Sequence, residues 1–208
     1  MKERKTPEKI LEEYTSAIKK GDTEAMVNVG LILEEQGNTE DAKKWYIRAM
    51  EMGNMKTAGN LAFLYESEGK LKEAEEALLK ASEAGDADSM NNLGIFYENR
   101  NRNNDAEKWY LKAIELGQTD ALSNLGFLYN NILGETEKAE EYFLKAAELE
   151  DSNVMNALGM ICSARGQMEK TEEWFLKGAK LGNKESRKNL VILYEHQGKF
   201  DEAIKYKD

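Results

Sequence analysis

Few side chains in this sequence belong to the types that most often carry out catalysis. The only histidine, His196, lies in YEHQGK with no serine, cysteine or second histidine tied to it by spacing. The only cysteine, Cys162, ends the apolar stretch LGMIC, which predicts a small buried group rather than a nucleophile. Adjacent carboxylates such as Glu172 and Glu173 are expected to be solvated faces of an acidic chain. We therefore predict no enzyme activity and no catalytic residue.

Metal and cofactor chemistry lack a sequence signature as well. The sequence has no glycine-rich phosphate loop and no His/Cys set at metal-ligand spacing. One cysteine can form neither an internal disulfide nor a thiolate metal site. We expect no bound metal and no cofactor.

A more informative polar residue is an asparagine that recurs inside apolar stretches. Asparagine costs ~0.5 kcal/mol relative to alanine inside a helix, so its recurrence needs a reason. One carboxamide offers a donor and an acceptor, which match one peptide unit whatever its side chain. Alternatively, duplication copied the residue, which now bonds a neighbouring helix or water. The asparagine row consists of Asn28, Asn60, Asn92, Asn124, Asn156 and Asn189, of which Asn156 stands one position early, beside Ala157.

Two further rows follow the asparagines along the same predicted face. Three residues on lies an apolar row, and one turn beyond it a largely acidic row. We favour packing between adjacent helices for the apolar row; partly exposed, it would form the floor of a groove. The acidic row would then prefer a neutral or basic ligand. The apolar row is Leu31, Phe63, Ile95, Phe127, Met160 and Ile192, and the acidic row is Glu34, Glu66, Glu98, Asn130, Ser163 and Glu195.

Composition limits the classes of protein to which these rows can belong. The chain has 208 residues with 29 Lys+Arg against 39 Asp+Glu, a net charge of −10. This balance argues against a nucleic-acid partner, which requires a cationic surface. No apolar run approaches the ~20 residues of a membrane span, and the start has no apolar signal region. We expect a cytoplasmic protein that binds neither nucleic acid nor membranes.

The rows arise from a sequence repeat that sets the architecture. An apolar stretch begins at residues 29, 61, 93, 125, 158 and 190, so the spacings are 32, 32, 32, 33 and 32 residues. A second stretch follows in each unit, as in DAKKWYIRA from 41, DAEKWYLKA from 105 and, cut short, EAIKY from 202. Both stretches have the 3.6-residue apolar period of a helix. The repeat predicts stacked helix pairs.

Small residues and caps delimit these helices. Glycines such as Gly53 and Gly69 are expected to end helices, with Asn101 and Glu150 in equivalent places. Residues Asp22, Asp86 and Asn183 are expected N-caps. We expect the crossing residues Gly30, Ala62, Gly94, Gly126 and Gly159 to face Ala42, Ala74, Ala106 and Ala139. We expect Trp45, Trp109, Tyr142 and Trp174 to fill the core between units.

The pattern L-G-x-x-Y followed by A-x-x-W-Y/F-x-x-A resembles the tetratricopeptide repeat. It is closer still to the Sel1-like repeat, as in GQTDALSNLGFLY from Gly117 to Tyr129. The units are shorter than usual tetratricopeptide units and lack their late proline and the Sel1-like loop insertion. The resemblance covers nearly the whole chain and implies an all-α, right-handed α-solenoid whose first helices line a concave groove. In that family, groove asparagines bind the backbone of an extended peptide.

We therefore predict a non-enzymatic scaffold that binds a protein or an extended, neutral to basic peptide. The predicted site comprises the asparagine row with Phe63, Ile95, Phe127, Met160, Glu66 and Glu98. The predicted organisation is an N-terminal capping helix (1–21) and repeats at 22–53, 54–85, 86–117, 118–150, 151–182 and 183–208. Because the last helix is too short to cover the sixth repeat, we expect either further chain beyond Asp208 or a homodimer through this end. A self-association module or a regulatory domain of a larger assembly is the alternative.

Overall fold

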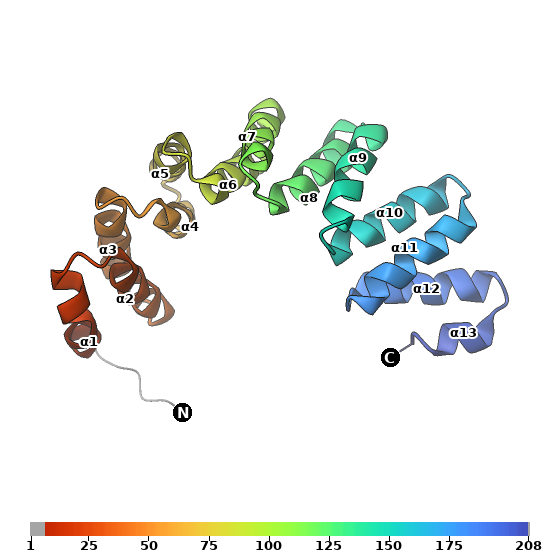
Figure 1. Ribbon diagram of the computed structural model, residues 1–208, viewed down its shortest axis with the longest axis horizontal. Helices are drawn as coiled ribbons and strands as arrows, with labels where there is room; N and C mark the ends of the chain where they lie inside the picture. The colour runs from red at the N-terminus through yellow and green to blue at the C-terminus, as the bar shows by residue number, and fades with distance from the viewer. Residues whose placement is uncertain (1–6, 208) are drawn as a thin grey trace. The chain divides into compact units, whose positions relative to one another are not determined.

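The computed structural model describes residues 7–207, which form thirteen α-helices and no strand (Figure 1). The predicted all-α array of antiparallel helix pairs is confirmed. Residues 1–6 of the predicted capping helix lie outside the described part, and α1 spans Pro7–Lys19. The first helices of the pairs are α2 (Thr23–Glu35), α4 (Ala58–Ser67), α6 (Ala87–Glu98), α8 (Asp120–Phe127), α10 (Ser152–Ala164) and α12 (Lys184–His196). The second helices are α3 (Thr39–Glu51), α5 (Leu71–Glu83), α7 (Asn103–Glu115), α9 (Thr136–Ala147), α11 (Met168–Lys180) and the short α13 (Phe200–Ile204).

The chain divides into two compact units, with the boundary inside α7 between Ala113 and Ile114. Unit 1 contains the first three helix pairs and unit 2 the last three. One continuous array over all six pairs stays a prediction. Within residues 7–207, no helix is both long and apolar enough to span a bilayer.

Helix ends follow the chemistry of the sequence. The side chains of Asp22, Asp86 and Asn183 each accept a hydrogen bond from a backbone N–H three residues later, which confirms the three predicted N-caps. Asn101 and Glu150 adopt left-handed φ values of 57° and 62° at the expected helix ends. Asparagine tolerates this conformation, whereas glutamate adopts it at a steric cost.

The residue of the second helix that packs against the crossing glycine differs from the one expected. A Cβ on Gly94 would lie 2.4 Å from Cε1 of Tyr110, so the ring of the second helix lies directly against the glycine backbone. Phe143 has the same relation to Gly126. The side chain nearest to each crossing glycine is therefore not one of the expected alanines but a ring four positions further along the second helix. It is Tyr46, Tyr110, Phe143 or Phe175 against Gly30, Gly94, Gly126 or Gly159, respectively.

The tryptophans are less central than expected. Trp45, Tyr142 and Trp174 are half-buried, and only Trp109 is buried. A cation three residues later covers each ring, as Lys112 covers Trp109 with Nζ 4.0 Å from the centroid. The core position belongs to the next residue along the helix, for example Tyr46 and Phe143, which are fully buried.

The single 33-residue spacing appears as a π-helical turn. Three residues separate Tyr97 from the left-handed Asn101, whereas four separate Tyr129 from the left-handed Gly134. The extra residue is absorbed by η2 (Leu128–Leu133), a π-helix that continues α8. Such turns hold one added residue without breaking the helix and are frequent at functional sites.

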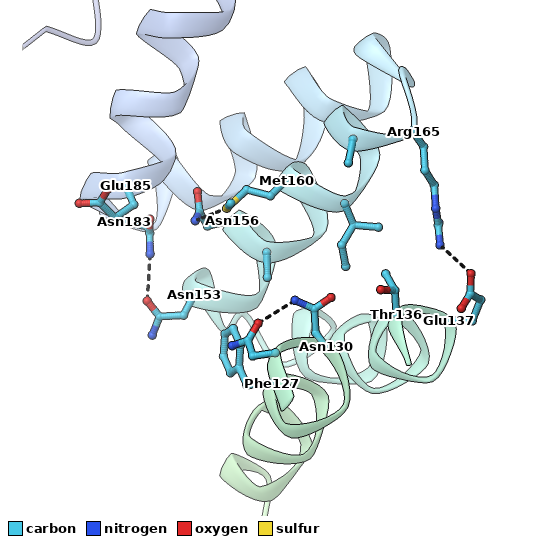
Figure 2. Close-up of a pocket in the computed structure, with 14 residues that line it drawn as sticks. Phe127, Asn130, Thr136, Glu137, Asn153, Asn156, Met160, Arg165, Asn183 and Glu185 are labelled. Carbon is cyan, nitrogen blue, oxygen red and sulfur yellow. Dashed lines mark hydrogen bonds and ion pairs between the residues drawn. The ribbon is translucent and has the colours of Figure 1, made fainter. Parts of the chain in front are cut away.

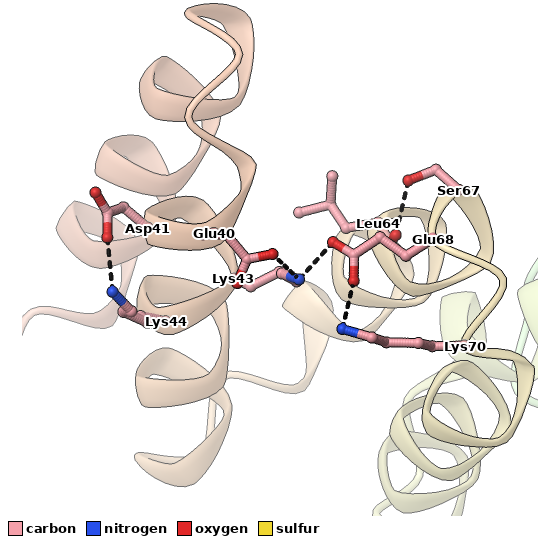
Figure 3. A network of polar contacts seen from close by, with 8 residues as sticks. All are labelled: Glu40, Asp41, Lys43, Lys44, Leu64, Ser67, Glu68 and Lys70. Carbon is pink, nitrogen blue, oxygen red and sulfur yellow. Dashed lines mark hydrogen bonds and ion pairs between the residues drawn. The ribbon is translucent and has the colours of Figure 1, made fainter.

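Ion pairs join consecutive helix pairs inside each unit. Lys43 of α3 is buried and pairs with Glu40 at 2.7 Å and with Glu68, which also pairs with Lys70 at 2.8 Å (Figure 3). Burial lowers the pKa of Lys43, but its hydrogen bonds to Glu40 and Glu68 outweigh this effect and raise the pKa. In three later helix pairs the signs of the two charges are exchanged, because the residue equivalent to Lys43 is a glutamate that pairs with an arginine or a lysine. These pairs are Glu75–Arg102 (3.1 Å), Glu140–Arg165 (2.6 Å) and Glu172–Lys199 (4.0 Å).

Candidate functional site

The apolar row is exposed. Five of its six members have 38–64% of their surface accessible: Leu31, Phe63, Ile95, Met160 and Ile192. The exception, Phe127, is half-buried against Phe143 with ring centroids 4.9 Å apart. Packing between adjacent first helices, the favoured interpretation, is therefore wrong for most of the row. Large apolar side chains in a shared register instead form the surface of the first helices in each unit.

Unit 1 contains a small groove between α4 and α6. It has a volume of about 230 Å³ and brings together five predicted site residues, Asn60, Phe63, Glu66, Asn92 and Ile95. The groove floor is close to the backbone, because a Cβ on Gly59 would lie 2.7 Å from Nδ2 of Asn92. Asn28 lies one pair earlier, exposed on α2.

Unit 2 contains a larger groove of about 830 Å³ between η2, α10 and the start of α12 (Figure 2). Three predicted site residues line it: Phe127, Asn156 and Met160. Sequence reasoning placed Asn130 only in the acidic row and missed three other asparagines that line the groove. They are Asn131, Asn153 and Asn183. The interrupted 32-residue spacing was the signal that could have drawn attention to Asn130 and Asn131.

A second cavity in unit 2, of about 630 Å³, adjoins this groove through Met160 and Ala164. Its walls come from α10, α11 and α12 and are mainly apolar. They include Met168, Phe175 and Ile192, together with Asn189 of the asparagine row.

Members of the asparagine row have partners inside the chain. The Asn60 carboxamide hydrogen-bonds the hydroxyl of Tyr46. Asn189 donates from Nδ2 to Oδ1 of Asn156 at 2.9 Å, and Ser186 donates to the same oxygen at 3.3 Å. Asn92 and Asn124 are half-buried. These contacts fit the structural alternative for the row, although those of Asn60 and Asn189 do not use every donor and acceptor of the two carboxamides.

Two carboxylates of the acidic row accept hydrogen bonds from tyrosines of the second helices. Tyr46 donates to Oε2 of Glu34 at 2.7 Å, and Tyr110 donates to Oε2 of Glu98 at 2.7 Å. Burial, reinforced by these carboxylates, raises the pKa of both tyrosines, so the hydroxyls remain protonated donors. Each of these hydrogen bonds connects a glutamate on the surface of a first helix to a tyrosine whose ring is buried in the core.

The other two glutamates of the row form ion pairs. Glu66 pairs with Arg100 at 2.9 Å, and Glu195 pairs with Lys207 at 2.8 Å. Where the second helix has a ring without a hydroxyl, the row has no carboxylate. Repeats 4 and 5 thus combine Phe143 with Asn130 and Phe175 with Ser163. Every carboxylate of the acidic row therefore has a donor within the chain, so part of its capacity to accept hydrogen bonds from a ligand is already used.

The candidate catalytic residues are far from a reactive arrangement. Cys162 is buried, and burial raises the pKa of its thiol, so the nucleophilic thiolate is disfavoured. His196 is exposed in the last turn of α12. Among the described residues, no three His, Cys, Asp or Glu side chains gather where they could share a metal ion.

Comparison with known proteins identifies the family. Models of the tetratricopeptide repeat match residues 23–52, 56–84, 87–119 and 119–153, more than half of the sequence. The chain belongs to the tetratricopeptide repeat family, whose repeats indicate a scaffold for protein–protein interaction. No curated protein sequence matches it.

Solved structures share the fold. pilF of Pseudomonas aeruginosa superposes with a TM-score of 0.73 at 24% identity, covering 88% of each chain. A Sel1 repeat protein from Oxalobacter formigenes gives a TM-score of 0.71 at 23% identity, covering 89% of this chain and 86% of that one. The protective antigen c5321 of uropathogenic Escherichia coli gives 0.74 at 24% identity, covering 94% of this chain and 47% of the antigen.

Proposed function

We propose that each unit binds an extended polypeptide segment across the exposed face of its first helices. The observation that carries this proposal is the exposure of the apolar row next to half-buried carboxamides. Apolar side chains in a groove gain binding energy when a partner covers them, and carboxamides match the partner's backbone. In unit 1 both chemistries line one groove, with Phe63 and Ile95 beside Asn60 and Asn92.

Charge favours a ligand that is neutral to weakly basic. The glutamates of the acidic row already have a hydrogen-bond or ion-pair partner in Tyr46, Arg100, Tyr110 or Lys207. A cationic side chain would meet carboxylates that are already partnered, and an anionic one would be repelled. Backbone and apolar contacts therefore supply most of the expected affinity.

Peptides selected from a displayed random library on the immobilised full chain test the proposal. We expect Phe63→Ala to weaken the binding of peptides that dock on unit 1 by roughly 10- to 100-fold, because burying one aromatic ring contributes ~1.5–3 kcal/mol. The matched control is Phe200→Ala, since Phe63 and Phe200 are 64% and 63% exposed and Phe200 lies on α13. Isothermal titration calorimetry measures both variants. Failure of the library to yield any binding peptide contradicts the proposal.

A second candidate is self-association through α13. Phe200 and Ile204 are each 63% exposed on this five-residue helix, whereas Ala203 is buried against Phe175 and Leu190. Removing residues 200–208 would uncover that core cluster, so we expect a changed association state or aggregation. Sedimentation of the full and shortened chains measures this; two soluble monomers contradict self-association.

A further inference from the structure

We propose that the π turn of the fourth helix pair makes the groove of unit 2 selective for an uncharged, extended segment that carries a large apolar side chain. The inference rests on the proposed function and names the ligand chemistry of one of its two sites. The evidence is the inserted residue, the groove beside it and the pairing of the charges around that groove.

The inserted residue lies beside the groove of about 830 Å³ in unit 2. Figure 2 shows Asn130 of η2 facing the groove across from Asn153, Asn156 and Met160 of α10. The groove between α4 and α6 in unit 1 has about 230 Å³, against about 830 Å³ beside η2. A volume in this range suits a bound ligand of several residues' side chains and backbone.

The groove offers hydrogen bonds, and each charged side chain that lines it has a partner of opposite charge. Arg165 pairs with Glu140 at 2.6 Å and with Glu137 at 3.8 Å, and Glu185 pairs with Lys188 at 2.7 Å. A charged ligand group would lose its hydration without gaining an unpaired counter-charge. An uncharged backbone meets no such cost.

Carboxamides supply the recognition. Asn130 donates to Oδ1 of Asn131 at 2.8 Å, and Asn183 donates to Oδ1 of Asn153 at 3.0 Å. Each hydrogen bond orients its two side chains, and each pair has further N–H groups and oxygens that this bond does not use. Oriented donors and acceptors lose little entropy on binding, which favours a peptide backbone as their partner.

The adjoining cavity accounts for the apolar side chain. It meets the groove at Met160 and Ala164, and its walls include Met168, Phe175 and Ile192. A segment lying on the carboxamides can therefore place one Leu, Met or Phe side chain in this cavity. The other residues of the segment would lie in the groove itself, so only one large apolar side chain is required.

Peptides are selected from the displayed random library on the wild-type chain. The test compares their affinity for that chain with their affinity for three variants. Deletion of Asn131 restores three residues between Tyr129 and Gly134, and Asn130→Ala with Asn131→Ala keeps the chain length. We expect the selection to yield uncharged peptides that contain one large apolar residue. The affinity of these peptides should fall at least tenfold for the deletion variant and for the double alanine variant. Phe63→Ala, in the groove of unit 1, is the matched control and leaves this class unchanged.

The outcomes separate this inference from the proposed function. Peptides that bind but need Phe63, or that keep their affinity in both unit 2 variants, overturn the inference and leave peptide binding intact. Selection of mainly charged peptides on unit 2 also overturns it. Absence of any binding peptide overturns the proposed function itself. If circular dichroism shows that the deletion variant misfolds, the double alanine variant decides alone.

Discussion

Gly126→Leu will lower the free energy of unfolding by about 1–3 kcal/mol, because the crossing of α8 and α9 has no room for a side chain. A Cβ at residue 126 would lie 2.5 Å from Cδ1 and Cε1 of Phe143. The Phe143 ring is fully buried, so it cannot turn towards solvent to make space. Urea unfolding followed by circular dichroism measures the change. Undiminished stability would show that residue 126 does not lie at the crossing.

The second helix pair supplies a matched control for this experiment. There the crossing residue is Ala62 and the facing position, equivalent to Phe143, is Leu78, and both are buried. Gly126→Ala alone should destabilise the chain, whereas in a Phe143→Leu background it should be better tolerated. Additive effects, within ~0.3–0.5 kcal/mol, would mean that the two residues do not share a contact.

The sequence predicts the repeat architecture well because local signals determine it. The 3.6-residue period identifies the helices, and capping residues such as Asp86 identify where they begin. Burial of Cys162 follows from its register, which tyrosine occupies in other repeats. Each of these conclusions needs only the chain within a few turns of the residue concerned.

The errors concern quantities that depend on how helices pack. Trp45 and Tyr46 are neighbours on one helix, and the crossing with α2 decides which ring is buried against Gly30. Likewise, the spacing of adjacent first helices leaves Phe63 exposed, although its register alone fits an interior position equally well. The π turn was visible only as a one-residue change in spacing, which does not show how the helix absorbs it.

Replacing Asn28, Asn60 and Asn92 together with alanine will weaken the binding of peptides that dock on unit 1 by roughly 10- to 1000-fold. Each hydrogen bond from a carboxamide to a peptide backbone contributes a net ~0.5–1.5 kcal/mol, and ~1.4 kcal/mol is tenfold in affinity. Adjacent helices pack ~8–10 Å apart, and an extended peptide advances ~3.3 Å per residue. Consecutive asparagines would therefore meet every third peptide unit, so the three contacts can form at once.

The triple variant should keep its helicity, which separates recognition from folding. Alanine is the better helix former at all three positions. Loss of Asn60 removes one hydrogen bond to the Tyr46 hydroxyl, but that hydroxyl still donates to Glu34. Asn104→Ala, on an exposed position of α7, is the control for a general loss of polar surface. If the triple variant binds as tightly as this control, the row serves only to connect helices, and the exposed apolar residues alone account for peptide binding.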